Sequence, residues 1–207
     1  MSKGFFITFE GMDGSGKSTQ IEILKKRLES NGEDVIFLRE PGGTPISEKI
    51  REIILDKGNS EMTDVTEMLL YAAARAQLVE EVIAPALRAG RTVICDRFID
   101  SSIAYQAYGR ELGDCVSAVN SYALGGIMPD LTILLRSDAN LGETRIRDRE
   151  KDRIEMAPDS FRDRVCRGYE LIEKADPDRV VGIDARDTVE NISSRIWDEV
   201  ESRRGEA

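Results

Sequence analysis

One stretch near the start of the chain has residue types and spacing suited to binding phosphate. It runs from Gly11 to Ser18 and reads Gly, four residues, then Gly-Lys-Ser. Glycines let the backbone curl so that successive N–H groups point into one concavity and hold phosphate oxygens. The amine of Lys17 can reach the β- and γ-phosphates of a nucleotide, and the hydroxyl of Ser18 can bind magnesium. We therefore predict a phosphate-binding loop.

The residues on either side of this loop support the prediction. Residues 5–9 form a short apolar run typical of a strand, and Ile21, Leu24 and Leu28 follow at helical spacing. A strand, a glycine loop and the first turn of a helix thus follow in order, and the helix N-terminus itself favours an anion. The alternative is a chance glycine-rich turn, which eight matching residues in this context argue against.

Composition narrows the class of protein. The chain has 207 residues with a formal net charge of −10, which argues against a general nucleic-acid binder. No run approaches the roughly 18 apolar residues of a membrane span, and no signal-peptide pattern is visible. The three cysteines fit no zinc spacing, so we expect free thiols in the cytoplasm. Histidine is absent, which excludes histidine-based catalysis and metal binding.

Alternating patterns along the chain predict an α/β fold. Predicted strands cover 5–9, 34–39, 92–96, 130–135 and 180–183. Predicted helices include 64–89 with a bend at Pro85, 100–108, one before Gly125, 140–151, 160–174 and 189–202. We expect one domain, residues 1–207, with a five-stranded parallel sheet between two layers of helices. Ligands then belong at the carboxyl ends of the strands.

Charged residues follow two of the predicted strands. Arg39 and Glu40 end the second, and Asp96 and Arg97 end the third. The simpler interpretation of the second pair is an ion pair on the surface. Because both pairs converge with the phosphate-binding loop, we predict that Asp96 lies near the magnesium and that Arg97 binds a phosphate.

Two further groups have a functional and a structural interpretation. Tyr71 and Arg75 share one helix face, where the ring could stack on a base and the arginine could reach its phosphate. The alternative is a core tyrosine beside a solvent-exposed arginine. The basic stretch 145–153 could fold over the nucleotide and donate to the transferring phosphoryl group, or form a solvated helix face with its interspersed acids.

Together these residues identify a family. Segments 9–20, 39–45, 48–51, 71–80, 96–106 and 152–155 resemble those of thymidylate kinases, most closely the bacterial type, and the resemblance covers essentially the whole length. The loop alone is shared by many nucleotide-binding families. Arg-Glu-Pro-Gly-Gly-Thr at 39–44, and Ser-Ser followed by Ala-Tyr-Gln at 101–106, are far more specific.

The resemblance implies a P-loop NTPase-type fold and transfer of the γ-phosphoryl of ATP to dTMP, giving dTDP and ADP, with Mg²⁺ bound by Ser18 and Asp96. It also implies a homodimer and a mobile lid at about 140–156. The implied ATP-binding residues are Gly11, Met12, Asp13, Gly14, Ser15, Gly16, Lys17, Ser18 and Thr19. The implied catalytic residues are Lys17, Asp96, Arg97, Arg147, Arg149 and Arg153.

The resemblance also implies a dTMP site. Its residues are Asp13, Glu40, Arg51, Tyr71, Arg75, Arg97, Ser101, Ser102, Tyr105 and Gln106. Within it Asp13 meets the sugar 3′-hydroxyl, Arg75 and Arg97 hold the acceptor phosphate, and Arg51 reaches into the site. Tyr71 stacks on thymine, Ser102 bonds its edge, and Tyr105 crowds the 2′ position. Two residues depart from the family pattern, Phe98 and Arg136.

Two other functions compete with this interpretation. One is another nucleoside monophosphate kinase or a deoxynucleoside kinase, which an acceptor panel would distinguish. The other is a GTPase-type switch, which would be expected to carry an Asn-Lys-x-Asp motif for reading the base, and the sequence has none.

Overall fold

The computed structural model of the protein describes residues 4–137 and 152–205. Five strands form one sheet, and every neighbouring pair is parallel. They are β1 (Phe5–Glu10), β2 (Val35–Arg39), β3 (Thr92–Asp96), β4 (Leu131–Arg136) and β5 (Val180–Asp184). All five strands were predicted, each within about two residues of its observed bounds.

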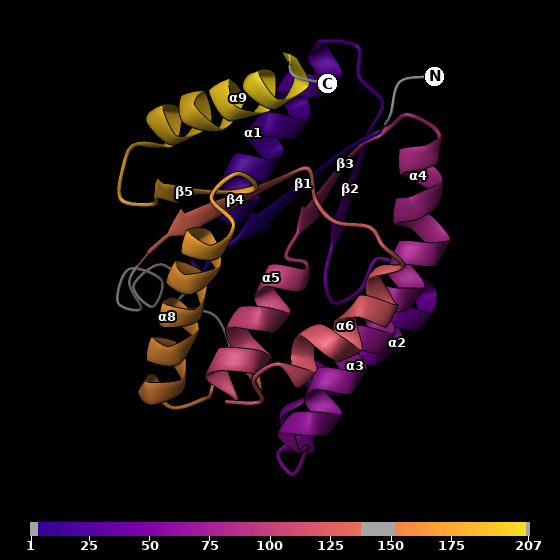
Figure 1. Ribbon diagram of the computed structural model, residues 1–207, viewed down its shortest axis with the longest axis vertical. Helices are drawn as coiled ribbons and strands as arrows, with labels where there is room; N and C mark the ends of the chain where they lie inside the picture. Colours follow the sequence, from indigo (N-terminus) through magenta and orange to yellow (C-terminus); the bar gives the residue numbers. More distant parts are fainter. Residues whose placement is uncertain (1–3, 138–151, 206–207) are drawn as a thin grey trace.

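Helices connect the strands and cover both faces of the sheet (Figure 1). They are α1 (Lys17–Ser30), α2 (Pro45–Leu55), α3 (Asp64–Leu78), α4 (Ala84–Arg88), α5 (Ile99–Ser102), α6 (Cys115–Leu124), α8 (Asp159–Ala175) and α9 (Val189–Gly205). A 3₁₀ turn, η1 (Lys57–Asn59), follows α2. The predicted helix 140–151 lies outside the described residues.

The order of the strands across the sheet is β2-β3-β1-β4-β5. β1 lies at the centre, with Phe9 opposite Asp96 of β3 and Glu10 opposite Leu134 of β4. From β1 the chain passes to the edge strand β2, returns to β3 beside β1, and then continues to β4 and β5 on the other side. The connections that leave β1 and β3 therefore run to opposite sides, and a crevice opens at the carboxyl ends of these central strands. A parallel sheet of this kind binds ligands at that point, and the phosphate-binding loop follows β1 there.

The two faces of the sheet have separate cores. Ile7 and Phe9 of β1 point to the face covered by α1 and α9, where Leu24, Leu28 and Ile196 are buried with them. The opposite face packs β1 and β3 against the end of α3 and against α4, and packs β4 and β5 against α8. The parallel three-layer α/β fold predicted from the sequence is thereby confirmed.

Two helical segments contain a π-helical turn that the sequence did not reveal. The predicted helix 64–89 is one continuous path, but η2 (Val79–Ile83) interrupts it just before Pro85. The predicted helix 100–108 begins as α5 and continues as η3 (Ile103–Gly109), a π-helix. η3 carries Tyr105 and Gln106, so an irregular turn sets the direction of two predicted site residues. Within the described residues, no helix has the length and apolar character of a membrane span.

Candidate active site

The phosphate-binding loop closes around the amine of Lys17. The Nζ atom donates hydrogen bonds of 3.0 Å to the carbonyl oxygens of Gly11 and Met12. Burial, followed by the nearby guanidinium of Arg97, lowers the pKa of Lys17 to about 8. A phosphate bound in the loop would favour the charged amine, because it brings negative charge close to Nζ.

Glycines in the loop meet the demands predicted from their spacing. Gly11, Gly14 and Gly16 have φ of 131°, 75° and 99°, a region that favours glycine. A Cβ atom on Gly11 would lie 2.5 Å from the carbonyl oxygen of Leu135. The buried hydroxyl oxygen of Ser15 has no hydrogen-bond partner among the described residues, and such an orphan group calls for a ligand.

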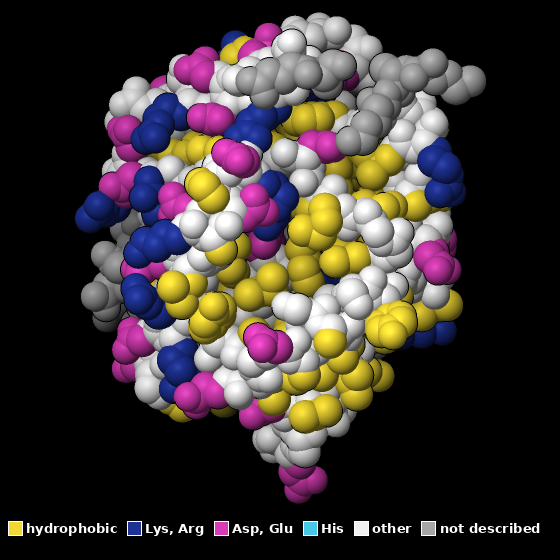
Figure 2. Space-filling model, in the orientation of Figure 1, with side chains coloured by type: hydrophobic (Ala, Val, Ile, Leu, Met, Phe, Trp, Pro, Cys, Tyr) yellow, Lys and Arg dark blue, Asp and Glu magenta, His cyan; other side chains and the backbone are white. Residues whose placement is uncertain are grey.

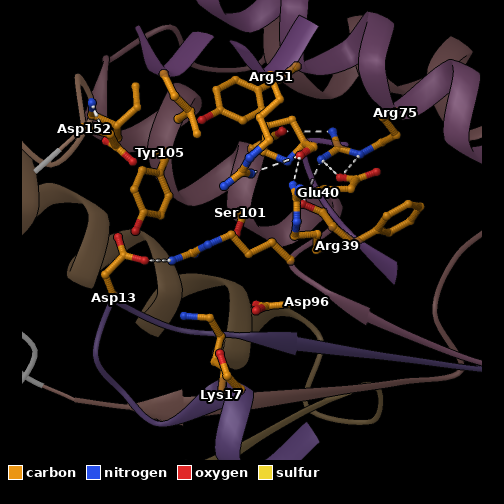
Figure 3. A pocket seen from close by; sticks show the side chains of 18 of the residues that line it. Asp13, Lys17, Arg39, Glu40, Arg51, Arg75, Asp96, Ser101, Tyr105 and Asp152 are labelled. Carbon is orange, nitrogen blue, oxygen red and sulfur yellow. Dashed lines mark hydrogen bonds and ion pairs between the residues drawn. The ribbon is translucent and has the colours of Figure 1, made fainter. Parts of the chain in front are cut away.

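A cavity of about 470 Å³ extends from this loop to the inner side of α3 (Figure 3). Its walls come from the loop, the ends of β2 and β3, and helices α2, α3, α5 and η3. Most of the predicted site residues line it, namely Asp13, Gly14, Gly16, Lys17, Ser18, Thr19, Glu40, Arg51, Tyr71, Arg75, Asp96, Arg97, Ser101, Ser102, Tyr105 and Gln106. Gly11 and Met12 instead line a second cavity of about 560 Å³ beside α8.

The end of the cavity beside the loop, which we call the phosphate end, gathers opposite charges. Arg97 Nη2 lies 2.7 Å from Asp13 Oδ1, and Figure 3 shows Lys17 and Asp96 on the same side. The buried Oδ1 of Asp96 has no hydrogen-bond partner within the described part of the chain. The surface ion pair considered for Asp96 and Arg97 is therefore not what the structure shows, since Arg97 pairs with Asp13.

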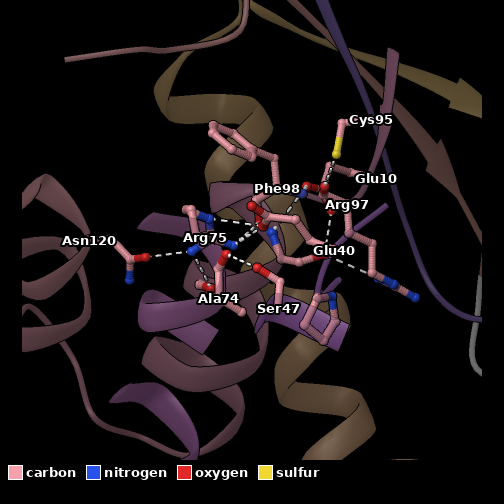
Figure 4. Close-up of polar contacts among 12 residues, drawn as sticks. Glu10, Glu40, Ser47, Ala74, Arg75, Cys95, Arg97, Phe98 and Asn120 are labelled. Carbon is pink, nitrogen blue, oxygen red and sulfur yellow. Dashed lines mark hydrogen bonds and ion pairs between the residues drawn. The ribbon is translucent and has the colours of Figure 1, made fainter. Parts of the chain in front are cut away.

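At the other end of the cavity, which we call the base end, Arg75 is held on every side (Figure 4). Its Nε and Nη2 donate to Glu40 Oε2, and Nη2 also reaches the Phe98 carbonyl at 2.9 Å. Its Nη1 donates to Ser102 and Asn120. All five N–H donors thus have protein acceptors, and the side chain is 1 % exposed.

This arrangement differs from both expectations for Arg75. The residue is not the solvent-exposed arginine of the structural alternative, because it is fully buried. Nor does it have a donor left for an acceptor phosphate, the role that the resemblance implied. Arg97 lines the same cavity with fewer acceptors around it: Nη1 donates to Ser101 and Tyr169, and Nη2 donates to Asp13.

Aromatic and polar side chains complete the wall. Tyr71 lines the cavity from α3, and Tyr105 lines it from η3 with a buried hydroxyl that has no partner among the described residues. Gln106 donates to Glu67 at 3.0 Å, so its amide nitrogen is turned away from Ser102 toward α3. Arg51 donates to the Pro41 carbonyl at 3.0 Å, and burial lowers its pKa.

Comparison with known proteins then identifies the family. The sequence model of the thymidylate kinase family matches residues 9–196. The chain is 47 % identical over 197 residues to a thymidylate kinase of an Exiguobacterium species, covering 94 % of this chain and 93 % of the relative. It is 49 % identical over 203 residues to that of Halothermothrix orenii, covering 96 % and 97 %. The chain belongs to the thymidylate kinase family.

A solved structure of the same family agrees. The thymidylate kinase from Ehrlichia chaffeensis superimposes with a TM-score of 0.78 at 31 % identity, covering 96 % of this chain and 99 % of that one. The family and the enzyme class predicted from the sequence are confirmed. The roles of individual residues stay predictions.

Of the three arginines predicted to act from the lid, the structure describes one. Arg147 and Arg149 lie outside the described residues. Arg153 is described, and its Nη2 donates to Glu67 at 2.7 Å while its Nε donates to the Ile54 carbonyl at 2.7 Å. In this structure Arg153 is therefore tied to α2 through Ile54 and to α3 through Glu67.

The two departures from the thymidylate kinase pattern have plain structural settings. Phe98 is fully buried and packs edge-on against Phe6, with ring centroids 5.0 Å apart. Arg136 donates to the Gly182 carbonyl at 2.8 Å and lies 3.7 Å from Glu173. Phe98 lines the 470 Å³ cavity, whereas Arg136 lines the second cavity beside α8.

The sequence analysis missed several residues that organise the site. Glu67 accepts hydrogen bonds from Gln106, Arg110 and Arg153 although its side chain is fully buried. The Tyr169 hydroxyl accepts a hydrogen bond from Arg97, and Glu10 accepts one from the backbone N–H of the next residue, Phe98. Two of these are acids within apolar runs, and an acid at a core position is itself a signal, because it must be paired when buried.

Proposed function

We propose that this thymidylate kinase family member transfers the γ-phosphoryl group of ATP to dTMP within the 470 Å³ cavity, giving dTDP and ADP. ATP binds with its phosphates in the loop around Lys17, and dTMP occupies the remainder of the cavity. The carrying observation is that one cavity joins a phosphate-binding loop to an aromatic wall containing Tyr71 and Tyr105. Phosphoryl transfer depends mainly on positioning and charge neutralisation, which this arrangement can supply.

Arg97 is the residue that we assign to the acceptor phosphate. Its guanidinium lies between the loop and the rest of the cavity, with 17 % of the side chain exposed. Burial disfavours the charged form of Arg97, but Tyr105, Asp13 and Tyr169 outweigh it and raise its pKa well above the usual value, so it stays charged in the site. A fixed positive charge in a partly dry cavity stabilises the charge that develops on the transferring group.

The residues at the loop fit Mg²⁺. Asp96 has a buried carboxylate oxygen without a partner among the described residues, and Ser18 lies at the first turn of α1. Mg²⁺ prefers oxygen ligands and commonly takes only one or two from the protein, with phosphate and water supplying the rest. We therefore assign Ser18 and Asp96 to Mg²⁺, which when bound neutralises charge on the β- and γ-phosphates.

For the sugar and base we keep the predicted contacts with one change. Tyr71 stacks on thymine, Tyr105 borders the 2′ position, and Asp13 faces the 3′-hydroxyl. Ser102 and Gln106 bound the base, and Glu40 acts through Arg75. Because Arg75 has no free donor, its contribution is to hold Glu40 and Ser102 in place.

A coupled ADP-release assay across acceptors tests the proposal. With ATP and Mg²⁺ we expect rapid turnover with dTMP and slow turnover with thymidine, dCMP, GMP and UMP. Chelation of the metal should abolish it, because the phosphate charge would no longer be neutralised. Slow ATP hydrolysis that ignores the acceptor would contradict the proposal and favour a nucleotide-dependent switch. Preference for another monophosphate or for thymidine would indicate the neighbouring kinase classes.

A homodimer is the second part of the proposal. Exposed apolar side chains lie on neighbouring helices α3 and α6, with Leu69 49 %, Val65 50 % and Tyr122 89 % exposed. Figure 2 shows hydrophobic side chains gathered where these helices lie. A second copy would bury them. Light scattering should give twice the chain mass for the wild type, and Leu69→Glu should yield monomers; an unchanged mass would contradict this surface.

Two further assignments rest on the sequence. We propose that residues 1–207 form one domain whose segment 140–156 acts as a lid over ATP. We also propose a cytoplasmic location, supported by the lack of a disulfide among Cys95, Cys115 and Cys166, all of which the structure describes. Thiol labelling of the protein in fresh cell extracts without a reductant tests the proposed location, and we expect all three cysteines to be labelled. Disulfide-linked chains would contradict it.

A further inference from the structure

The backbone of Arg97 has an unusual conformation. Its φ is 67°, a left-handed value rare for a residue with a side chain. Such a conformation costs on the order of 1–3 kcal/mol and persists only when the surroundings hold it. Here the Arg97 N–H donates to the Phe9 carbonyl at 2.9 Å, and the Phe98 N–H donates to Glu10 Oε1 at 2.8 Å. The end of β1 therefore fixes the turn that carries Arg97.

Besides the contacts that hold its backbone, Arg97 has side-chain contacts that hold its guanidinium. Nη1 donates to Ser101 Oγ at 3.1 Å and to the Tyr169 hydroxyl at 3.2 Å. Tyr169 belongs to α8, 72 residues further along the chain, and is only 4 % exposed. The remaining contact, from Nη2 to Asp13, lies on the cavity side. Two hydroxyls thus brace the guanidinium from behind.

Both sets of contacts converge on one buried carboxylate, that of Glu10. Glu10 Oε1 accepts from the backbone N–H groups of Phe98 and Ser101, at 2.8 and 3.3 Å. Glu10 Oε2 accepts from the Ser101 hydroxyl at 2.6 Å and from the Tyr169 hydroxyl at 3.0 Å. The same residue therefore holds the backbone turn through one oxygen and the two bracing hydroxyls through the other.

We propose that Glu10 and Tyr169 are positioning residues for Arg97, and that the Tyr169 hydroxyl, oriented by Glu10, aims the guanidinium at the acceptor phosphate. This inference rests on the proposed function, in which Arg97 binds that phosphate. Neither residue reaches the cavity that holds the substrates, so both act through Arg97.

The hydroxyl of Tyr169 can be separated from its ring. The ring packs edge-on against Tyr105, with centroids 6.3 Å apart, and is buried with Phe161 and Val165. Phenylalanine would keep that packing. The buried hydroxyl would be costly without partners, and its partners are Glu10, Ser101 and Arg97. Removing it therefore tests its role in orienting Arg97 without removing the aromatic packing.

The first experiment compares Tyr169→Phe with wild type by calorimetric binding of dTMP and of thymidine, which lacks the phosphate. We expect dTMP to bind about tenfold more weakly, the size of one lost hydrogen bond to a charged group, and thymidine to bind unchanged. The value of kcat should fall by at least the same factor. Tyr108→Phe is the control, because Tyr108 also packs against α8, at Gly168, from η3, outside the cavity.

The second experiment is a double-variant cycle with Arg97→Ala. If Tyr169 acts through Arg97, adding Tyr169→Phe to Arg97→Ala should cost no further dTMP affinity. Multiplicative losses, equal weakening of thymidine, or unchanged dTMP binding in Tyr169→Phe would each overturn the inference. Should Tyr169→Phe not fold, Glu10→Gln takes its part in both experiments, because Glu10 lies outside the cavity and its carboxylate orients both bracing hydroxyls.

Failure of the proposed function gives a different result. If Arg97→Ala alone leaves dTMP binding intact, Arg97 does not hold the acceptor phosphate, whatever Tyr169 does. If Arg97→Ala weakens dTMP but Tyr169→Phe does not, the function stands and the positioning role is wrong.

Discussion

Arg75 and Arg97 lie in one cavity, yet their environments differ. Arg75, at the base end, is 1 % exposed, and all its donors have protein acceptors that include the carboxylate of Glu40. Arg97, at the phosphate end, is 17 % exposed, and its guanidinium lines the cavity. The difference teaches that burial of an arginine does not by itself indicate substrate binding. What distinguishes the two roles is the number of donors left without an acceptor.

The largest predicted effect is on kcat, and it concerns the positive charge that stabilises the transferring phosphoryl group at the phosphate end. The loop positions between Gly11 and Gly16 hold no arginine, so the donor to the transferring group must come from elsewhere. We expect Arg149→Ala, or Arg147→Ala if that residue acts instead, to lower kcat by about 10³-fold or more with little change in the KM for dTMP.

Arg153→Ala is the matched control for that prediction. Because Arg153 is fixed to Glu67 and to the Ile54 carbonyl, its loss should lower the free energy of unfolding more than it lowers kcat. Near-normal kcat in all three single variants and in the triple variant would show that the charge comes from another group.

The base end predicts the largest effect on stability. Arg75→Leu leaves the Glu40 carboxylate buried without its cation, a change that typically costs about 3–5 kcal/mol. Arg97→Leu should cost clearly less, since Asp13 is 38 % exposed and can be solvated. Urea unfolding of both variants measures this difference. Equal losses of stability would mean that the two arginines are equivalent braces.

At the phosphate end we expect substitutions to lower turnover rather than stability. Lys17→Ala and Arg97→Ala should each raise the barrier by about 2.7–4 kcal/mol, because each removes a charge from a preorganised site. Steady-state assays together with circular dichroism make the measurement. Either variant retaining a normal fold and more than half the wild-type kcat would contradict the assignment.

The sequence predicted one of these two ends better than the other. The spacing from Gly11 to Ser18 is local, and its chemistry follows from adjacent residues. The strands and most helices were likewise predictable, because apolar periodicity is a local property. Most of the site residues that the family resemblance selected, including Tyr71 and Tyr105, line one cavity although they come from segments far apart in the chain.

The pairing of buried charges was not predictable in the same way. Arg75 meets Glu40 from 35 residues away and Asn120 from 45, and only the folded chain brings them together. The strand order, which sets β1 between β3 and β4, is also non-local. For the same reason Glu10 read as the end of a strand rather than as a residue that holds the turn of Arg97.

Glu10 predicts a smaller, pH-dependent effect at the phosphate end. Burial and the neighbouring carboxylate of Asp100 raise its pKa to about 7, although Arg97, Ser101 and the Phe98 N–H favour the charged form. The folded protein then binds this proton more tightly than the unfolded chain, for which the value is near 4.5. Unfolding free energy should therefore fall as pH rises from about 4.5 to about 7, by up to about 3 kcal/mol.

Glu10→Gln is the control for this titration, because glutamine keeps the shape and cannot ionise. The difference in unfolding free energy between pH 5 and pH 8 should shrink in the variant by the amount attributed to Glu10. Chemical denaturation at both pH values measures it. Identical pH dependence in the two proteins would mean that Glu10 stays in one charge state throughout.

The smallest predicted effect concerns the sugar, at the boundary between the two ends. Tyr105 borders the cavity with a buried hydroxyl that has no partner among the described residues, and the guanidinium of Arg97 lies 5.3 Å from its ring centroid. With the ring at the 2′ position, as proposed, an added 2′-hydroxyl would clash with it, so we expect dUMP to be preferred to UMP with the base held constant. A steric difference of this size is worth about 1–3 kcal/mol, or roughly 10–200-fold in kcat/KM. Tyr105→Ala should relax this preference, whereas Tyr105→Phe should retain it, because exclusion depends on the ring. If wild type shows equal kcat/KM for dUMP and UMP, or if the phenylalanine variant loses the preference as fully as the alanine variant, ring bulk does not select the sugar.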